Sequence, residues 1–213
     1  MKRPAITILL LSILISMALI SRTQSGKRFL AIHLPKKEVT YSKPPEYVSR
    51  LKSKGSEART FALKKGYNPD FCFLIDMRLP SYQDRFFVYD LKEGKLLTQG
   101  LVAHGRCGED WLQGRRYGNT VGCGCTSLGR YKVGYDYKGR FGLAFKLYGL
   151  DATNSNAFER FVVLHSHSCV PETEVDGEIC QSDGCPTVAP GFLEQIAPMI
   201  KGSKKPVLLW IYE

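Results

Sequence analysis

A cysteine and a histidine are the side chains of this 213-residue sequence with the clearest capacity for chemistry. Cys185 directly follows Gly184, and His165 directly follows the apolar run Phe161–Leu164. A thiol attacks as its thiolate, and a nearby imidazole can accept the thiol proton. A histidine carried at the end of a strand could act as that base. The pair therefore indicates acyl transfer through a cysteine nucleophile.

The residues around Cys185 fit the same chemistry. Gly184 permits an unusual backbone conformation and a close approach of substrate. The N–H groups of Gly184 and Cys185 could donate hydrogen bonds to a tetrahedral oxyanion. The competing hypothesis is that Cys185 is disulfide-bonded, which composition alone favours in an exported protein.

Most of the elements expected to position these residues are short β-strands. Turn residues separate runs that are rich in β-branched and aromatic side chains. The predicted strands are Phe71–Met77, Phe86–Tyr89, Leu96–Val102, Gly129–Asp136, Leu143–Leu147, Phe161–Leu164 and Lys205–Tyr212, and Gly191–Ile200 is the one late helix. The sequence shows no internal repeat and no second core, so residues 67–213 are predicted to form one mainly β domain.

The first 66 residues read differently from the rest. Residues 1–25 contain Lys2 and Arg3 followed by an apolar run, which is typical of a signal peptide or signal anchor. Residues 26–44 are predicted to be a basic tether. Residues 45–66 are predicted to be a helical lead, opened by Pro45, weakened at Gly55 and ending near Gly66. We therefore expect export to the periplasm or cell surface, with membrane tethering if the signal is not cleaved.

The net charge of +10 belongs to the N-terminal part of the chain. Residues 22–66 carry 12 Lys and Arg against three Glu, whereas residues 67–213 carry 16 basic and 17 acidic residues. A near-neutral body argues against nucleic-acid binding. The basic segment is either a solvated helix face or an attachment to an anionic envelope polymer or membrane surface.

The order of an apolar strand, His165-Ser166, a variable loop and Ser182-x-Gly184-Cys185 resembles the catalytic signature of murein L,D-transpeptidases. The likeness extends to Phe73–Gly105 and to Ser127–Tyr131, and Cys185-Pro186 resembles the branch with proline after the catalytic cysteine. The resemblance implies a single β-sandwich or barrel domain with a few short helices, preceded here by an N-terminal helical segment.

Carried over to this chain, the resemblance makes Cys185 the nucleophile and His165 its general base and later acid. Ser166 would orient the imidazole through its backbone carbonyl, and Ser182 would shape the cysteine loop. Many family members have His-Gly-Cys where this chain has Asp183-Gly184-Cys185, so a role for that second histidine is not transferable.

Four further side chains are candidates for substrate binding. His167 could replace the missing histidine or be polar surface. His104 could line the cleft, but a structural histidine bonded to backbone fits equally well. Tyr148 and Arg160 could contact substrate, and nothing in the sequence separates that role from packing and solvation.

Six cysteines remain if Cys185 is catalytic, and an exported protein permits disulfides. Cys169 and Cys180 bracket the loop between His165 and Cys185 and are one expected pair. Cys107 with Cys123 or Cys125 is a second, which leaves Cys72 without an obvious partner. A zinc site is disfavoured because Cys-x-Cys is not the usual Cys-x2-Cys spacing. No metal and no cofactor is expected.

The resemblance implies an exported cysteine acyltransferase that acts on peptidoglycan stem peptides. Cys185 would form a thioester, and an amine acceptor would complete L,D-transpeptidation. With water as acceptor, the same site would be an L,D-carboxypeptidase or endopeptidase. The alternative from another class is a non-catalytic, disulfide-stabilised envelope-binding module, in which Cys185 would lie in a disulfide or on zinc.

Overall fold

The structure, a computed structural model, describes residues 45–213. The predicted signal segment 1–25 and tether 26–44 lie outside the described residues. The helices are α2 (Pro45–Lys65), η1 (Ala152–Asn154) and α3 (Pro190–Gly202). The strands are β1 (Phe71–Asp76), β2 (Phe86–Asp90), β3 (Lys95–Gly100), β4 (Val102–Ala103), β5 (Gly129–Gly139), β6 (Gly142–Gly149), β7 (Val163–Ser166), β8 (Thr187–Val188) and β9 (Val207–Tyr212).

One nine-stranded sheet curls into a nearly closed barrel. Its order is β3-β2-β1-β9-β5-β6-β7-β8-β4, so β3 and β4 are the two edges. Only Leu101 separates the end of β3 from the start of β4 along the chain. Because one residue cannot span a flat sheet of nine strands, the two edges must approach each other. The mainly β barrel fold predicted from the sequence is confirmed.

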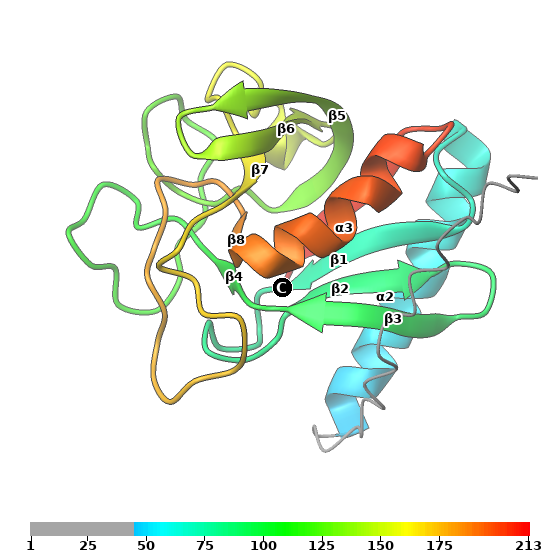
Figure 1. Ribbon diagram of the computed structural model, residues 1–213, viewed down its shortest axis with the longest axis horizontal. Helices are drawn as coiled ribbons and strands as arrows, with labels where there is room; N and C mark the ends of the chain where they lie inside the picture. The colour runs from blue at the N-terminus through cyan, green and yellow to red at the C-terminus, as the bar shows by residue number, and fades with distance from the viewer. Residues whose placement is uncertain (1–44) are drawn as a thin grey trace, which may run out of the picture. The chain divides into compact units, whose positions relative to one another are not determined.

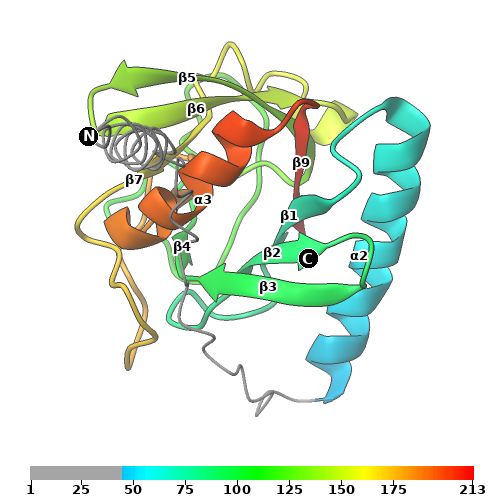
Figure 2. The ribbon, with the colours of Figure 1, turned by 45° about the vertical axis from the view of Figure 1, so that its right-hand side comes forward.

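Side chains on the two faces of β1 belong to two hydrophobic cores, each covered by one helix. Phe73 and Ile75 belong to the core that α3 covers, whereas Cys72 and Leu74 belong to the core that α2 covers. Successive strand residues point to opposite faces of a sheet, which explains the division. Figures 1 and 2 show α2 and α3 on opposite sides of β1, β2 and β3.

Helix α2 runs without a break through Gly55, where the sequence suggested a weak point and a second helix start. A Cβ on Gly55 would lie 2.2 Å from the Tyr89 ring. Glycine is therefore required for the helix to approach β2 this closely, and this tertiary packing offsets its poor helix propensity.

Three details of the sheet differ from the sequence prediction. The run Leu96–Val102 is two edge strands rather than one, because the chain leaves β3 and enters β4 at Leu101. Strand β7 begins at Val163 rather than at Phe161, whose backbone is left-handed with φ of 55°. The two-residue strand β8 was not predicted, because its length gives no pattern.

Candidate active site

The loop that carries Cys185 is anchored to the edge strand β4. The Ser182 N–H donates to the His104 carbonyl at 2.8 Å, and the Arg106 N–H donates to the Ser182 carbonyl at 2.9 Å. Beyond the loop, β8 pairs in parallel with β7, where Thr187 lies opposite His165. The loop is thus fixed on both sides, which holds Cys185 beside the strand that carries His165.

The Ser182 side chain closes the turn that presents Cys185. Its hydroxyl donates to the Cys185 carbonyl at 2.7 Å and accepts from the Gly184 N–H at 3.2 Å. Ser182 is therefore placed for the loop-shaping role that the resemblance implies. The Gly184 N–H is already used by this bond. Among residues 45–213 the Cys185 N–H has no hydrogen-bond partner, so it is the better of the two candidate oxyanion donors.

Cys185 is half-buried and belongs to neither disulfide. Its Sγ lies 3.8 Å from the Phe161 carbonyl oxygen. Burial raises the pKa of the Cys185 thiol, while the Val163 N–H and the charges of Arg160 and Lys146 act in the opposite direction. The thiol is therefore held mainly protonated at rest, and a base is required to generate the thiolate.

The His165 imidazole is buried and held at both nitrogens. Nδ1 lies 3.1 Å from the Ser166 carbonyl oxygen, and Nε2 lies 3.0 Å from the Thr187 hydroxyl. A carbonyl can only accept, so Nδ1 carries the proton and Nε2 accepts from Thr187. Burial lowers the pKa of His165 below its ordinary value. A neutral imidazole with a bare Nε2 is the form that a general base requires.

Thr187 is a residue that sequence reasoning missed, and its hydroxyl holds Nε2 of the imidazole. We expect Thr187→Val to lower the rate of acyl-enzyme formation about 10-fold, because the imidazole loses a hydrogen bond that orients it. Thr187→Ser keeps the hydroxyl and should retain most of the rate. Stopped-flow acylation of both variants checks this, and equal rates for valine and serine would contradict it.

His104 is buried beneath the site rather than in an open cleft. Its Nδ1 lies 3.0 Å from Nη2 of the fully buried Arg85, and its Nε2 lies 3.2 Å from the Gly114 carbonyl oxygen. A guanidinium only donates, so His104 is neutral with its proton on Nε2. Burial and the Arg85 charge lower the pKa of His104 to about 4. The geometry favours the structural alternative for this residue.

The depressed pKa of His104 makes stability depend on pH. The unfolded histidine binds protons below about pH 6.5, whereas folded His104 does so only near pH 4. The free energy of unfolding therefore falls as pH drops through this window, by up to about 3 kcal/mol from this group. Urea unfolding at about pH 7 and about pH 4.5 should show a smaller loss for His104→Gln than for His167→Gln. Equal losses would contradict the assignment.

His167 and His165 both contact the ring of Phe141. Phe141, at the tip of the β5–β6 hairpin, stacks on His165 at 5.0 Å between ring centroids and meets His167 edge-on at 5.3 Å. His167 Nδ1 also accepts from the Cys169 N–H at 3.1 Å. His167 therefore borders the site without occupying the position of a second catalytic histidine.

Tyr148 and Arg160, the other two candidates, differ in what they contact. The Tyr148 ring stacks on Phe158, further along the sheet. The Arg160 guanidinium donates to the carbonyls of Gly118 and Cys125 and to the Ser127 hydroxyl. Arg160 thus ties the turn before β7 to the loop before β5, which is a positioning role rather than a substrate contact.

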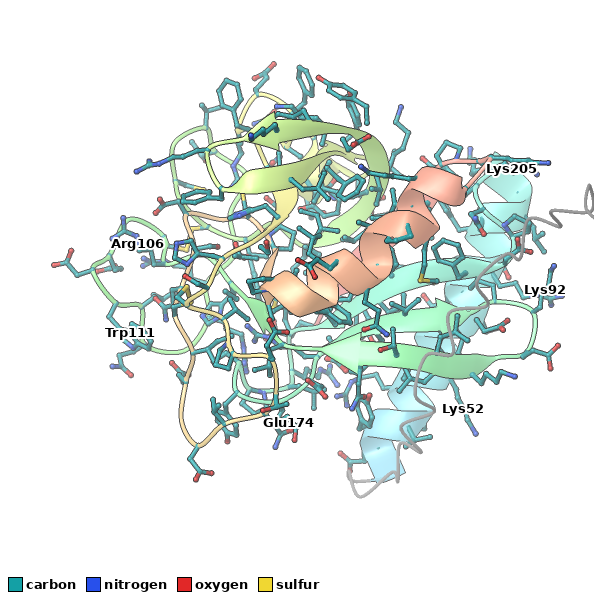
Figure 3. All side chains as sticks on the ribbon, viewed as in Figure 1. Lys52, Lys92, Arg106, Trp111, Glu174 and Lys205 are labelled. Atoms are coloured by element: carbon teal, nitrogen blue, oxygen red, sulfur yellow. A yellow bond between two sulfur atoms is a disulfide. The ribbon has the colours of Figure 1, made fainter. Side chains whose placement is uncertain are left out.

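Asp183 replaces the histidine found in many relatives, and its carboxylate pairs with Arg106. The Arg106 Nε lies 2.8 Å from Asp183 Oδ1, and both side chains are substantially exposed. Arg106 belongs to the loop that follows β4, which Figure 3 shows away from α2 together with Trp111. An exposed pair of this kind adds little stability.

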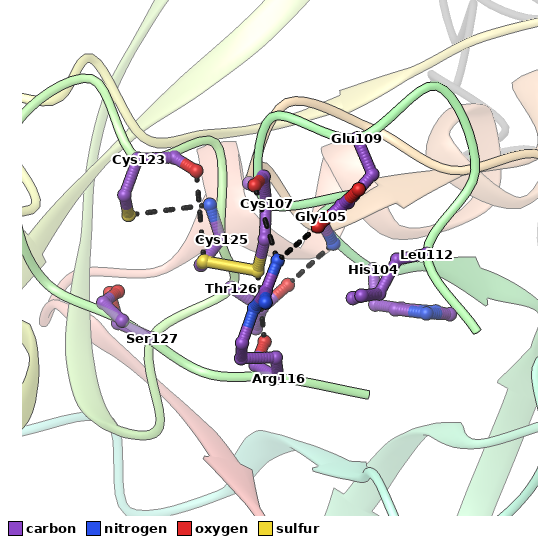
Figure 4. Close-up of a disulfide and its surroundings, with 12 residues drawn as sticks. His104, Gly105, Cys107, Glu109, Leu112, Arg116, Cys123, Cys125, Thr126 and Ser127 are labelled. Carbon is purple, nitrogen blue, oxygen red and sulfur yellow. Dashed lines mark hydrogen bonds and ion pairs between the residues drawn. A yellow bond between two sulfur atoms is a disulfide. The ribbon is translucent and has the colours of Figure 1, made fainter. Parts of the chain in front are cut away.

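Four of the seven cysteines form two disulfides. Cys169–Cys180 is the predicted pair, and Cys107 pairs with Cys125 rather than with Cys123. Cys123 Sγ accepts from the Cys125 N–H at 3.4 Å, beside the disulfide (Figure 4). The free Cys72 is buried, which raises the pKa of its thiol.

Residues 45–213 contain neither a metal-binding cluster nor a membrane-spanning helix. No group of three or more His, Cys, Asp and Glu side chains is arranged to hold a metal ion. No helix in that range has the length and apolar character needed to cross a membrane.

Phe161 and Lys146, which also act on Cys185, were not predicted from the sequence either. The signal for Thr187 was present, because it follows Cys185 by two residues and shares its side of an extended chain. Phe161 carried no such signal, since its left-handed backbone is set by the turn that closes onto Ala157 and Phe158.

The fold and these side chains define a class: a β-barrel domain with a free cysteine on the loop before β8 and a buried histidine on the neighbouring strand β7. The sequence matches the family profile of the L,D-transpeptidase catalytic domain over residues 47–212. The chain belongs to this family. No curated protein sequence matches it significantly.

Solved structures of similar fold include two L,D-transpeptidases. One, from Mycobacterium smegmatis, is 11% identical with a TM-score of 0.42, and the match covers 68% of this chain and 59% of that one. Another, from Stackebrandtia nassauensis, is 13% identical with a TM-score of 0.41, and the match covers 78% of this chain and 64% of that one. The chain thus spans less than two thirds of either structure.

Proposed function

We propose that the protein is an exported, cysteine-dependent murein L,D-transpeptidase that acts on peptidoglycan stem peptides. The observation that carries the proposal is the family match over nearly all of the described chain. The placement of Cys185 and His165 on neighbouring elements supports it. Within the family, we assign the chain to the branch with Ser-x-Gly-Cys-Pro at residues 182–186.

The first step is attack of the Cys185 thiolate on the amide between the diamino acid at position three of the stem and a terminal D-alanine. The Thr187 hydroxyl can turn from Nε2 of His165 to the Cys185 carbonyl, which lies 3.3 Å away. That turn frees Nε2 to take the thiol proton. The imidazolium then returns the proton to the leaving amine, the C–N bond breaks, and D-alanine departs.

The second step consumes the thioester at Cys185. A side-chain amine of another stem attacks the carbonyl carbon, the C–S bond breaks, and the thiol recovers its proton through His165. The product is a 3→3 cross-link. With water as the nucleophile, the same step gives L,D-carboxypeptidase activity, and the acceptor decides between the two outcomes.

Export is part of the proposal. Two disulfides among the described residues support it, because disulfides persist in oxidising compartments. Residues 1–25 would direct export, and the basic residues 26–44 would face an anionic polymer or membrane surface. Fusion of residues 1–44 to a reporter that is active only outside the cytoplasm tests this, and an inactive, stable fusion would contradict it.

The enzymatic test uses the full chain and muropeptides with tetrapeptide stems. Release of D-alanine together with 3→3 dimers is the expected result. Release without dimers would assign the hydrolytic alternative. A folded preparation that releases no D-alanine and forms no adduct with a carbapenem by intact mass would overturn the proposal.

A further inference from the structure

A lysine lies on the same face of the sheet as the candidate base. In the β6–β7 pairing, Ala144 lies opposite His165 and Lys146 lies opposite Val163. Residues two apart in a strand share a face, so Lys146 and His165 lie on one side of the sheet. The Lys146 charge also acts on the Cys185 thiol. Lys146 is therefore a cation on the face of the sheet that carries the candidate base.

Three aromatic rings hold the Lys146 ammonium. Its Nζ lies 4.8 Å from the centroid of Tyr137, 5.7 Å from that of Phe158 and 5.4 Å from that of Phe161. Lys146 makes no ion pair with any carboxylate of residues 45–213. Ring faces attract a cation without neutralising it. The cage therefore fixes the position of a net positive charge that remains available to a ligand.

Phe161, one of the three rings around Lys146, has an unfavourable backbone conformation and an exposed side chain. Its φ of 55° is left-handed, which is unfavourable for a bulky residue, and its side chain is 73% exposed. A strained backbone and an exposed aromatic ring at one position commonly mark a functional site. The same residue turns its carbonyl toward Cys185 Sγ. Phe161 thus links the lysine cage to the nucleophile.

Arg160, the other cation acting on Cys185, makes hydrogen bonds within the protein. Its guanidinium is committed to two backbone carbonyls and to the Ser127 hydroxyl. Lys146 has no such hydrogen bonds with the described chain. Arg160 is therefore directed toward the loop before β5, whereas no hydrogen bond within residues 45–213 competes with an incoming anion for the Lys146 ammonium.

We infer that Lys146, held by Tyr137, Phe158 and Phe161, binds the α-carboxylate of the residue that leaves when Cys185 attacks. The inference rests on the proposed function. That reaction expels a terminal amino acid, so its free carboxylate lies one residue from the scissile amide. A caged cation on this face of the sheet would distinguish a terminal amide from an internal one, which makes Lys146 a specificity determinant.

The test compares two donors on the full chain: a stem tetrapeptide ending in D-alanine and the same peptide ending in D-alaninamide. The wild-type protein should acylate from the acid about 10- to 100-fold faster in kcat/KM than from the amide, because a charge-assisted hydrogen bond is lost. Lys146→Met should bring the acid down to the level of the amide. Lys146→Arg should retain part of the preference.

Lys132→Met is the matched control, because Lys132 also lies over a ring of the same hairpin, 4.5 Å from the centroid of Tyr148. It should keep the full preference. Iodoacetamide alkylation of Cys185 reports on the nucleophile independently of any substrate, and thermal unfolding reports on the fold.

These measurements distinguish a failure of the Lys146 inference from a failure of the proposed function. If Lys146→Met slows acid, amide and alkylation equally, the lysine only stabilises the thiolate and the inference is wrong, while the enzyme assignment stands. The inference is equally wrong if the wild type shows no preference or the methionine variant keeps it. If the wild type alkylates at Cys185 but processes neither peptide, the proposed function fails and the inference with it.

Discussion

Replacement of Cys185 by alanine is expected to abolish acyl-enzyme formation while the protein remains folded. In the proposed mechanism the thioester forms at Sγ of Cys185, so its removal leaves the acyl group without an acceptor. Loss of a covalent nucleophile lowers turnover by at least about 1000-fold. The half-buried side chain makes only weak polar contacts, so its loss should cost less than about 1 kcal/mol.

Intact mass spectrometry after exposure to a carbapenem is the direct measurement. The wild type should gain the mass of one acyl group, and Cys185→Ala should gain none. Cys123→Ala is the matched control, because Cys123 is the only other free cysteine with partial exposure in the described chain. It should acylate like the wild type. A Cys185→Ala protein that still acquires one acyl group would refute the assignment of the nucleophile.

The sequence was sufficient where local pattern decides the structure. Runs of β-branched and aromatic residues between turn residues located β1, β2, β5, β6 and β9, because such runs are typical of strands with buried faces. Cys169–Cys180 was predictable for a similar reason, since both cysteines bracket a single loop. His165 and Cys185 were likewise expected at the two ends of the loop that contains Cys169 and Cys180.

Long-range packing decided what the sequence could not show. The sequence leaves His104 open as a cleft residue or a structural one, and the choice depends on Arg85, 19 positions earlier, which donates to its Nδ1. Gly55 reads as a helix break until the Tyr89 ring is seen against it. The cage around Lys146 is a third case, because its rings come from β5 and from the turn before β7. Each of these three features depends on contacts between segments that are distant in the sequence, and the sequence pattern does not show which segments meet.

Gly184 is a position where a local sequence signal and a long-range contact coincide. Its φ of 110° is visible in the sequence only as a glycine before a cysteine. A Cβ at this position would lie 2.7 Å from the Cys125 carbonyl oxygen. That oxygen cannot easily move, because it accepts from Arg160 and its residue is locked to Cys107 by a disulfide.

Gly184→Ala is therefore expected to displace the cysteine loop. The positive φ costs about 1–2 kcal/mol for an L-residue, and the collision adds about 1–3 kcal/mol of overpacking. A shift of Cys185 by about 1 Å from its attacking position would lower acylation at least about 100-fold. Urea unfolding and carbapenem acylation measure the two effects separately.

Gly177→Ala isolates the backbone cost from the collision. Gly177 has a φ of 88°, and a Cβ there would meet nothing within 4 Å. Its alanine variant should lose only the backbone contribution to stability and should acylate at the wild-type rate. If both variants acylate normally, the contact between Gly184 and Cys125 does not position the nucleophile. If both lose activity, the conformation of the loop that Cys169 and Cys180 close matters more than that contact.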